Sequence, residues 1–141
     1  MPGLEFTCAT HTNLAIAADE KGQKAEAIQH YEKALAISPQ SVSALTNLAW
    51  LLATCSDASF RNGTRAVELA GRANQLSGGT NALVLRTLAA AYAENGQFGK
   101  AVEIARAAVQ LARTQGDNSL TWAFQQEIPL YELGLPYHEA K

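Results

Sequence analysis

The residues that could do chemistry lie far apart in this sequence. Its three histidines, His11, His30 and His138, show none of the short His-x-x-x-His or His-x-x-Glu-His spacings that bring two metal ligands onto one helix face. Histidine is the usual general base and metal ligand near neutral pH, so this scatter favours packing or surface roles. We therefore expect no metal site and no catalytic histidine.

The cysteines, glycines and acidic residues also show no pattern that is typical of an enzyme. Cys8 and Cys55 are expected near opposite ends of neighbouring helices, about 20 Å apart from the helical rise, which is beyond the reach of a disulfide. Free thiols fit a reduced, cytoplasmic compartment. Gly78-Gly79 lacks the strand and Lys-Thr pair of a phosphate-binding loop, and Asp19-Glu20 is typical of a solvated helix end. We predict a non-enzymatic protein without a cofactor.

The composition indicates which elements must position any functional residue. The 141 residues, about the length of one domain, include 27 alanines but only 5 valines and 5 isoleucines, which favours helices and excludes an all-β fold. The net charge of −2 argues against a nucleic-acid-binding protein. No apolar run approaches the roughly 18–20 residues that span a bilayer, and no signal peptide is visible.

Three stretches of the sequence repeat one another. Leu14, Leu48 and Leu88 each precede an alanine, and the first two leucines are 34 residues apart. A second matching alanine follows each leucine, at Ala27, Ala66 and Ala101. It lies 13 residues after the leucine in the first and third stretches and 18 residues after it in the second. Five residues are therefore inserted in the second stretch, within 54–64. Periods of about 20–50 residues are the signature of repeat architectures.

Each stretch predicts two amphipathic helices joined by a turn. In the first, Ala27, Tyr31 and Ala34 recur at helical spacing, and Gly22 suits the left-handed end of the preceding helix. Pro39 stops the second helix, because the residue before a proline is pushed out of the α region. The shared small residues let paired helices approach closely.

These features resemble the tetratricopeptide repeat. The first unit matches that family's pattern at Leu14, Ala15, Gly22, Ala27, Tyr31, Ala34 and Pro39, and the third at Leu88, Ala89, Tyr92, Gly96, Phe98, Ala101 and Ala108. The second unit lacks the turn glycine at the usual spacing and the closing proline. The resemblance implies an all-α, right-handed superhelical solenoid of three helix-turn-helix units, residues 8–41, 42–80 and 82–115, behind an N-terminal tail at 1–7.

Residues 116–135 are expected to cap the last repeat. Leu120, Phe124, Ile128 and Tyr131 follow one another at roughly helical spacing and can cover the exposed face of the third unit. Pro129 lies inside this pattern, so we expect a capping helix that is kinked or split near Ile128. Residues 136–141 are expected to form a C-terminal tail.

The resemblance implies a protein- or peptide-binding scaffold, whose concave groove is lined by the first helix of each repeat. The groove positions carried over from the family are Thr12, Asn13, Ile16, Glu20, Thr46, Asn47, Trp50, Thr54, Arg86, Thr87, Ala90 and Glu94. Asn13 and Asn47 suit a peptide main chain, because one amide both donates and accepts. The alternative for this pair is bonding to the neighbouring repeat, and for Trp50 it is burial against the insertion.

The chemistry of the groove limits its ligands. Some family members hold the C-terminal carboxylate of chaperones with basic and Asn side chains, and of that set only Asn47 has a counterpart here. We therefore do not expect that ligand. Glu20 and Glu94 make one edge acidic, which favours a neutral or basic ligand segment, although solvated helix ends explain these residues equally well.

Two other functions stay open. The first repeat has no preceding unit, so Thr10, Leu14 and Ala17 could form the contact of a weak homodimer. The chain could also be a regulatory domain of a larger enzyme, such as a glycosyltransferase. It looks like the C-terminal end of long bacterial tetratricopeptide proteins, which implies a bacterial source and further repeats in a parent protein. We expect a cytoplasmic protein, or a soluble part of a larger one, with a protein or peptide partner, no nucleic acid and no membrane insertion.

Overall fold

The computed structural model describes residues 6–140, and all regular elements in this range are helical. Of the expected N-terminal tail, residues 1–5 lie outside the described range, as does Lys141. The elements are α1 (Cys8–Glu20), α2 (Lys24–Ile37), α3 (Val42–Thr54), the short 3₁₀ helix η2 (Ala58–Phe60), α4 (Gly63–Leu76), α5 (Ala82–Glu94), α6 (Phe98–Thr114), α7 (Asn118–Gln125) and α8 (Ile128–Glu132). No helix in this range is long and apolar enough to cross a membrane.

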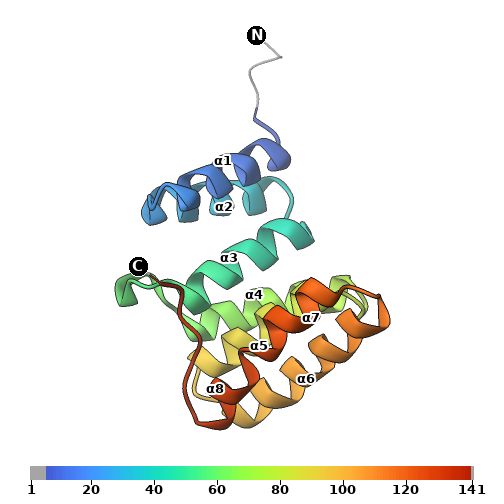
Figure 1. Ribbon diagram of the computed structural model, residues 1–141. Coiled ribbons are helices and arrows are strands. Elements are labelled where there is room, and N and C mark those ends of the chain that lie inside the picture. Colours follow the sequence, from blue (N-terminus) through green and yellow to red (C-terminus); the bar gives the residue numbers. More distant parts are fainter. Residues whose placement is uncertain (1–5, 141) are drawn as a thin grey trace.

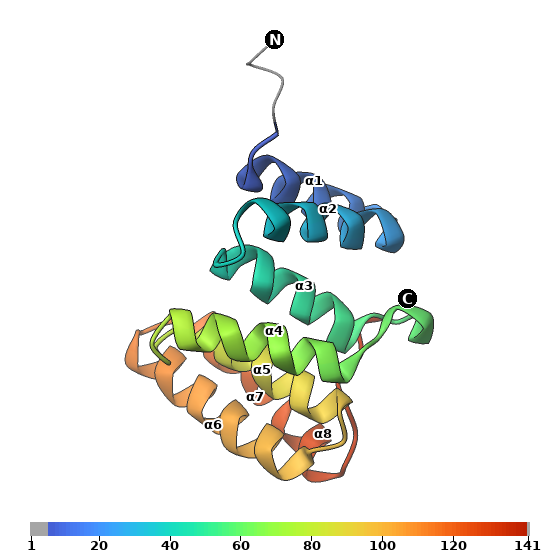
Figure 2. The ribbon, with the colours of Figure 1, turned by 180° about the vertical axis from the view of Figure 1, so that it is seen from behind.

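The first six helices form three hairpins that follow one another along the molecule (Figure 1). α1 pairs with α2, α3 with α4 and α5 with α6, and α7 and α8 pack against α6. Viewed from behind, α2, α4 and α6 lie on the near side of the stack (Figure 2). This arrangement confirms the predicted all-α solenoid of helix-turn-helix units.

Local signals set the ends of these helices. Ser41, Asn62 and Asn81 each accept a hydrogen bond from a main-chain N–H in the first turn of α3, α4 and α5. The turns of the first and third hairpins contain Gly22 and Gly96, each at φ 79°, a conformation that glycine adopts without steric strain. The same turn chemistry in both hairpins explains why their two halves keep the same spacing.

Buried alanines form the contacts between paired helices. Ala15 meets the same core cluster as Ala27, and both are 0% exposed. Ala101 and Ala108 of α6 are likewise 0% exposed. Small side chains at these positions let helix backbones approach more closely than leucine would allow, which the hairpins of a repeat protein require. The larger core residues, such as Leu45 and Leu48 of α3, fill the space between hairpins.

The insertion in the second unit is an ordered loop. Asn62 N–H donates to the carbonyl of Leu52 at 2.8 Å, which returns the chain to the end of α3 before α4 begins. Arg61 Nη1 donates to the carbonyl of Cys55 at 2.6 Å, and Phe60 packs against the main core cluster. Phe60 therefore covers apolar surface, whereas Asp57, Ala58 and Ser59 of the same loop are exposed.

The cap consists of two short helices. α7 ends at Gln125 and α8 begins at Ile128, so the chain divides where a kink or split was expected. Pro129 stands in the first turn of α8, where a missing N–H leaves no helical hydrogen bond unmade. Phe124 and Tyr131, each 1% exposed, cover two separate parts of α6. The division lets a short segment turn both aromatic rings inward.

The chain after α8 returns across the molecule. It runs without helical structure from Gly134 to the far end of α3, where Figure 1 shows the C-terminus beside the insertion. Glu139 N–H donates to the carbonyl of Thr54 at 2.7 Å. Residues 136–140 of the expected C-terminal tail are thus attached to the second repeat, and we call residues 133–140 the terminal segment.

Gly63 allows the closest approach between two hairpins. A Cβ at this position would lie 2.8 Å from the main-chain nitrogen of Asn95 and 2.9 Å from the carbonyl carbon of Glu94. These are backbone atoms of the turn after α5, so they cannot move aside as a flexible side chain would. At Gly71, inside the same helix, a Cβ would meet nothing within 4 Å.

We predict opposite effects for two glycine-to-alanine substitutions in α4. Gly63→Ala should lower the free energy of unfolding by about 1–3 kcal/mol, because the new methyl group forces the second and third hairpins apart. Gly71→Ala should raise it by about 0.5–1 kcal/mol through helix propensity alone. Urea denaturation of both variants measures the difference, and equal effects would contradict the close approach.

Candidate functional site

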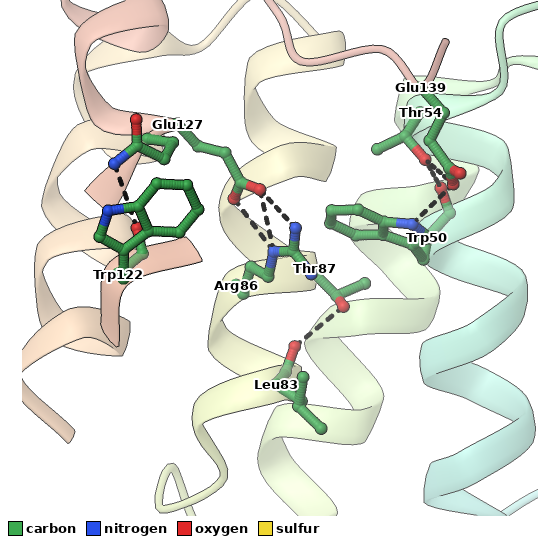
Figure 3. A network of polar contacts seen from close by, with 9 residues as sticks. Trp50, Thr54, Leu83, Arg86, Thr87, Trp122, Glu127 and Glu139 are labelled. Atoms are coloured by element: carbon green, nitrogen blue, oxygen red, sulfur yellow. Dashed lines mark hydrogen bonds and ion pairs between the residues drawn. The ribbon is translucent and has the colours of Figure 1, made fainter. Parts of the chain in front are cut away.

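One side chain of the third repeat joins three parts of the molecule (Figure 3). The guanidinium of Arg86, on α5, lies 4.2 Å from the ring centroid of Trp50 on α3 and 5.2 Å from that of Phe124 on α7. A cation at these distances is attracted by the electron-rich ring faces. Arg86 therefore holds Trp50 in place from the side of the cap.

The charge of Arg86 is matched by Glu127, between α7 and α8. Arg86 Nε lies 3.1 Å from Oε1 and 3.0 Å from Oε2 of Glu127, and Nη2 donates to Oε2 as well. The Glu127 side chain is only 5% exposed and that of Arg86 is 23% exposed. A carboxylate this deeply buried depends on its cation. Arg86 is consequently engaged within the chain.

Two adjoining cavities lie beside this cluster, between α3 and α5. Their volumes are about 190 and 240 Å³. Both are lined by Thr46, Asn47 and Leu83, so they form one continuous groove, and Trp50 and Arg86 close the smaller one. Leu83 is 48% exposed on its floor. We call this surface the α3–α5 groove.

Asn47 lies at the centre of the α3–α5 groove with most of its hydrogen-bonding capacity available. Its Nδ2 is 3.5 Å from Ser43 Oγ, one turn earlier on the same helix, which is at the limit of a hydrogen bond. No bond from this amide to the neighbouring repeat is found within residues 6–140, so the structural alternative gains no support.

The terminal segment covers the other end of the groove face. The Tyr137 ring lies against Trp50, with centroids 5.7 Å apart and planes 36° apart. Trp50 Nε1 donates to Glu139 Oε1 at 2.9 Å, and Thr54 Oγ1 approaches the same oxygen at 3.2 Å (Figure 3). Trp50 is thus covered by the terminal segment, where the sequence had offered the insertion as the alternative.

Glu94 binds both the terminal segment and the insertion. His138 Nε2 lies 2.6 Å from Glu94 Oε1, and Arg61 Nε lies 3.4 Å from Glu94 Oε2. The second distance indicates an ion pair without a short hydrogen bond. The acidic edge expected at Glu94 is therefore occupied by two nitrogen-bearing side chains of the same chain.

The remaining predicted groove residues separate into two groups. Thr87 and Ala90 are buried at 3% and 1% exposure, and the hydroxyls of Thr12, Thr46 and Thr87 each donate to a carbonyl one turn earlier. These side chains support the surface and offer little to a ligand. Asn13, Ile16 and Glu20 are exposed on α1. Asn13 lines a separate cavity of about 400 Å³ between α1 and α3.

The structure also brings together two histidines that the sequence had left apart. His11 Nδ1 on α1 lies 3.1 Å from His30 Nδ1 on α2, and the rings stack with centroids 5.3 Å apart. Burial, together with the nearby charges of His30 and Lys33, lowers the pKa of His11. Positions 11 and 30 belong to antiparallel helices of one hairpin, so pairing those helices residue by residue could have found the contact.

The described residues show no cluster of metal ligands. Within residues 6–140 no group of three or more His, Cys, Asp or Glu side chains is arranged to hold a metal ion. Cys8 and Cys55 are free thiols, and Cys55 is buried. The molecule is thus a stack of helical hairpins with an open groove and an internally bound terminal segment.

The comparisons with known proteins agree with this class. The family model of the tetratricopeptide repeat matches residues 8–41, which is the whole first unit. No curated protein matches the chain. The first unit is thus similar to a tetratricopeptide repeat, and repeats of this family generally mediate protein–protein interaction.

We predict that Arg86 is essential for stability. Arg86→Met should lower the free energy of unfolding by about 3 kcal/mol, because it leaves the Glu127 carboxylate buried without a partner. Arg106→Met is the matched control, since its pair with Glu132 is exposed and should contribute less than about 1 kcal/mol. Thermal and urea denaturation measure both changes. Similar small losses would show that Glu127 is hydrated instead of buried.

Proposed function

We propose that the protein binds an extended segment of a partner protein along the groove face of α3 and α5. The observation that carries this proposal is the terminal segment itself. A non-helical stretch of this chain lies against Trp50, Thr54 and Glu94 and is held by main-chain and side-chain bonds. The same face continues directly into the open α3–α5 groove.

The α3–α5 groove combines the two features that a peptide ligand needs. Leu83 offers apolar surface to a side chain, and the Asn47 amide can donate to and accept from a peptide main chain. Binding a backbone through one amide requires no particular ligand sequence, so side-chain contacts at Leu83 and Trp50 would supply the specificity. The protein would act as a scaffold and not as an enzyme.

We predict that Asn47→Ala weakens peptide binding and leaves the fold intact. Linear peptides selected from a displayed random library on the full chain should lose about 1 kcal/mol of affinity, or roughly fivefold. The thermal midpoint should stay nearly unchanged because the Asn47 side chain makes only one long local contact. Isothermal titration calorimetry with the selected peptides provides the measurement.

Gln110→Ala is the matched control for this experiment. Gln110 is exposed on α6, away from the lining of the α3–α5 groove, so its loss should change neither affinity nor stability. Selected peptides that bind the Asn47→Ala variant as tightly as the original chain would show that the groove is not the binding surface. A large drop in thermal stability would make Asn47 a structural residue.

Self-association through the first repeat is a second candidate function. Leu14 is 38% exposed and Ala17 is exposed on the same helix, although both belong to a hairpin whose other residues form core. Apolar residues at the open edge of a repeat stack are the surface on which a further unit would pack.

We predict that a homodimer formed through this edge dissociates in the Ala17→Glu and Thr10→Glu variants, because each places a charge in the contact. Sedimentation at several protein concentrations measures the change. Lys33→Glu on α2 is the control for the added charge. A chain that sediments as a monomer at every attainable concentration removes this candidate.

A further inference from the structure

Three consecutive residues of the terminal segment contact the groove face through three different interactions. The Tyr137 ring lies against Trp50, His138 binds Glu94, and Glu139 accepts a hydrogen bond from the Trp50 indole and lies 3.2 Å from the Thr54 hydroxyl. The main chain of the segment also contributes a contact, because Glu139 N–H donates to the Thr54 carbonyl at 2.7 Å. That carbonyl belongs to the last turn of α3, which has no helical partner for it.

The remainder of the terminal segment contributes little to this attachment. Leu133 is 74% exposed and Leu135 is 49% exposed, so the two large apolar side chains of the segment point away from any core. The segment is consequently held at Tyr137–Glu139, where Tyr137 also packs against the core cluster around Tyr131. The other two core clusters include no residue of the terminal segment, so opening the attachment leaves them covered.

The groove residues that hold the segment match its chemistry. Trp50 presents an aromatic face and an indole donor, and Glu94 presents an acceptor for a donor or cation. The one hydroxyl hydrogen of Thr54 is shared between the Trp50 carbonyl, at 2.7 Å, and the Glu139 carboxylate, at 3.2 Å. All three residues belong to the set of groove positions that the resemblance to the tetratricopeptide repeat implies. The segment therefore occupies ligand positions and leaves the rest of the groove, at Asn47 and Leu83, open.

We propose that the terminal segment is an internal ligand of the groove, and that the partner replaces it with a segment of the same chemistry. This inference rests on the proposed function. The partner's segment carries an aromatic side chain, then a histidine or a basic residue for Glu94, then a side chain whose carboxylate accepts from Trp50 and Thr54. It lies in an extended conformation and continues into the open groove at Asn47.

The tether explains why the partner must reach the open groove. A segment attached through a short linker is present at an effective concentration of about millimolar, so a free peptide that makes only the same contacts competes poorly. A partner that also contacts Leu83 and Asn47 gains binding that the internal segment does not have. The terminal segment thus raises the selectivity of the groove for longer ligands.

A peptide with the sequence of residues 133–140, LGLPYHEA, blocked at both ends and carrying a fluorophore, tests the proposal by fluorescence anisotropy. The full chain with Tyr137→Ala and Glu139→Ala should bind this peptide about tenfold more tightly than the original chain, because its own segment no longer competes. Leu133→Ser is the matched control within the same segment and should behave like the original chain.

Two further arms test the assigned contacts. The peptide LGLPAHAA should not bind the opened variant, and Trp50→Phe in the opened variant should weaken binding of LGLPYHEA about fivefold through loss of the indole donor. Equal affinity of the original and opened chains overturns the proposal, as does equal binding of the two peptides. Absence of binding to an opened variant whose thermal midpoint is unchanged overturns it as well.

The outcome can be separated from that of the proposed function, because the two experiments use different ends of the groove. If the library peptides bind in a way that depends on Asn47, but the opened variant does not bind LGLPYHEA, only the internal-ligand inference is overturned. If the opened variant binds LGLPYHEA, but Asn47→Ala does not change the affinity for the library peptides, the proposal that the α3–α5 groove binds the partner is overturned. A second copy of the chain as the occupant would appear as a dimer of the original chain in sedimentation and would overturn the internal assignment.

Discussion

The position of the Arg86 guanidinium determines how the groove is built. It lies over the rings of Trp50 and Phe124 and binds a carboxylate, Glu127, that is almost fully buried. Helices α3, α5 and α7 are thereby joined through one side chain of the third repeat. Trp50 can present its indole N–H to the terminal segment because its ring is fixed from the other side. The cap therefore supports the proposed binding surface as well as covering the last hairpin.

This arrangement divides the groove face into an occupied half and an open half. At one end, Trp50, Thr54 and Glu94 are occupied by the chain itself, and at the other end Asn47 and Leu83 face an open cavity. The two halves differ in charge, because the Glu94 carboxylate is already paired with His138 and Arg61, whereas the Asn47 side chain is neutral. Under the proposed function, a ligand that spans both halves would gain from each, whereas one that reaches a single half would have to displace the segment or rely on Asn47 and Leu83.

The hairpins could be predicted from the sequence because their determinants are local. Gly22 and Gly96 fix two turns, and the alanine spacing fixes which helices pair closely. The contacts that complete the site join residues far apart in the sequence, such as Arg86 with Glu127, 41 positions apart, and Trp50 with Glu139, 89 positions apart, and they leave no periodic trace in the sequence. The resemblance to the tetratricopeptide repeat therefore predicted Trp50, Thr54 and Glu94 as groove residues but did not predict the segment that binds them.

The most direct test of this account is the nuclear magnetic resonance spectrum of the original chain. The account predicts nuclear Overhauser contacts between the Trp50 and Tyr137 rings, whose centroids are 5.7 Å apart. It also predicts that Glu139→Gln shifts the Trp50 indole N–H resonance and leaves that of the exposed Trp122 unchanged. Random-coil shifts for residues 137–140, with no contact between the two rings, would contradict the central claim that the terminal segment occupies the groove.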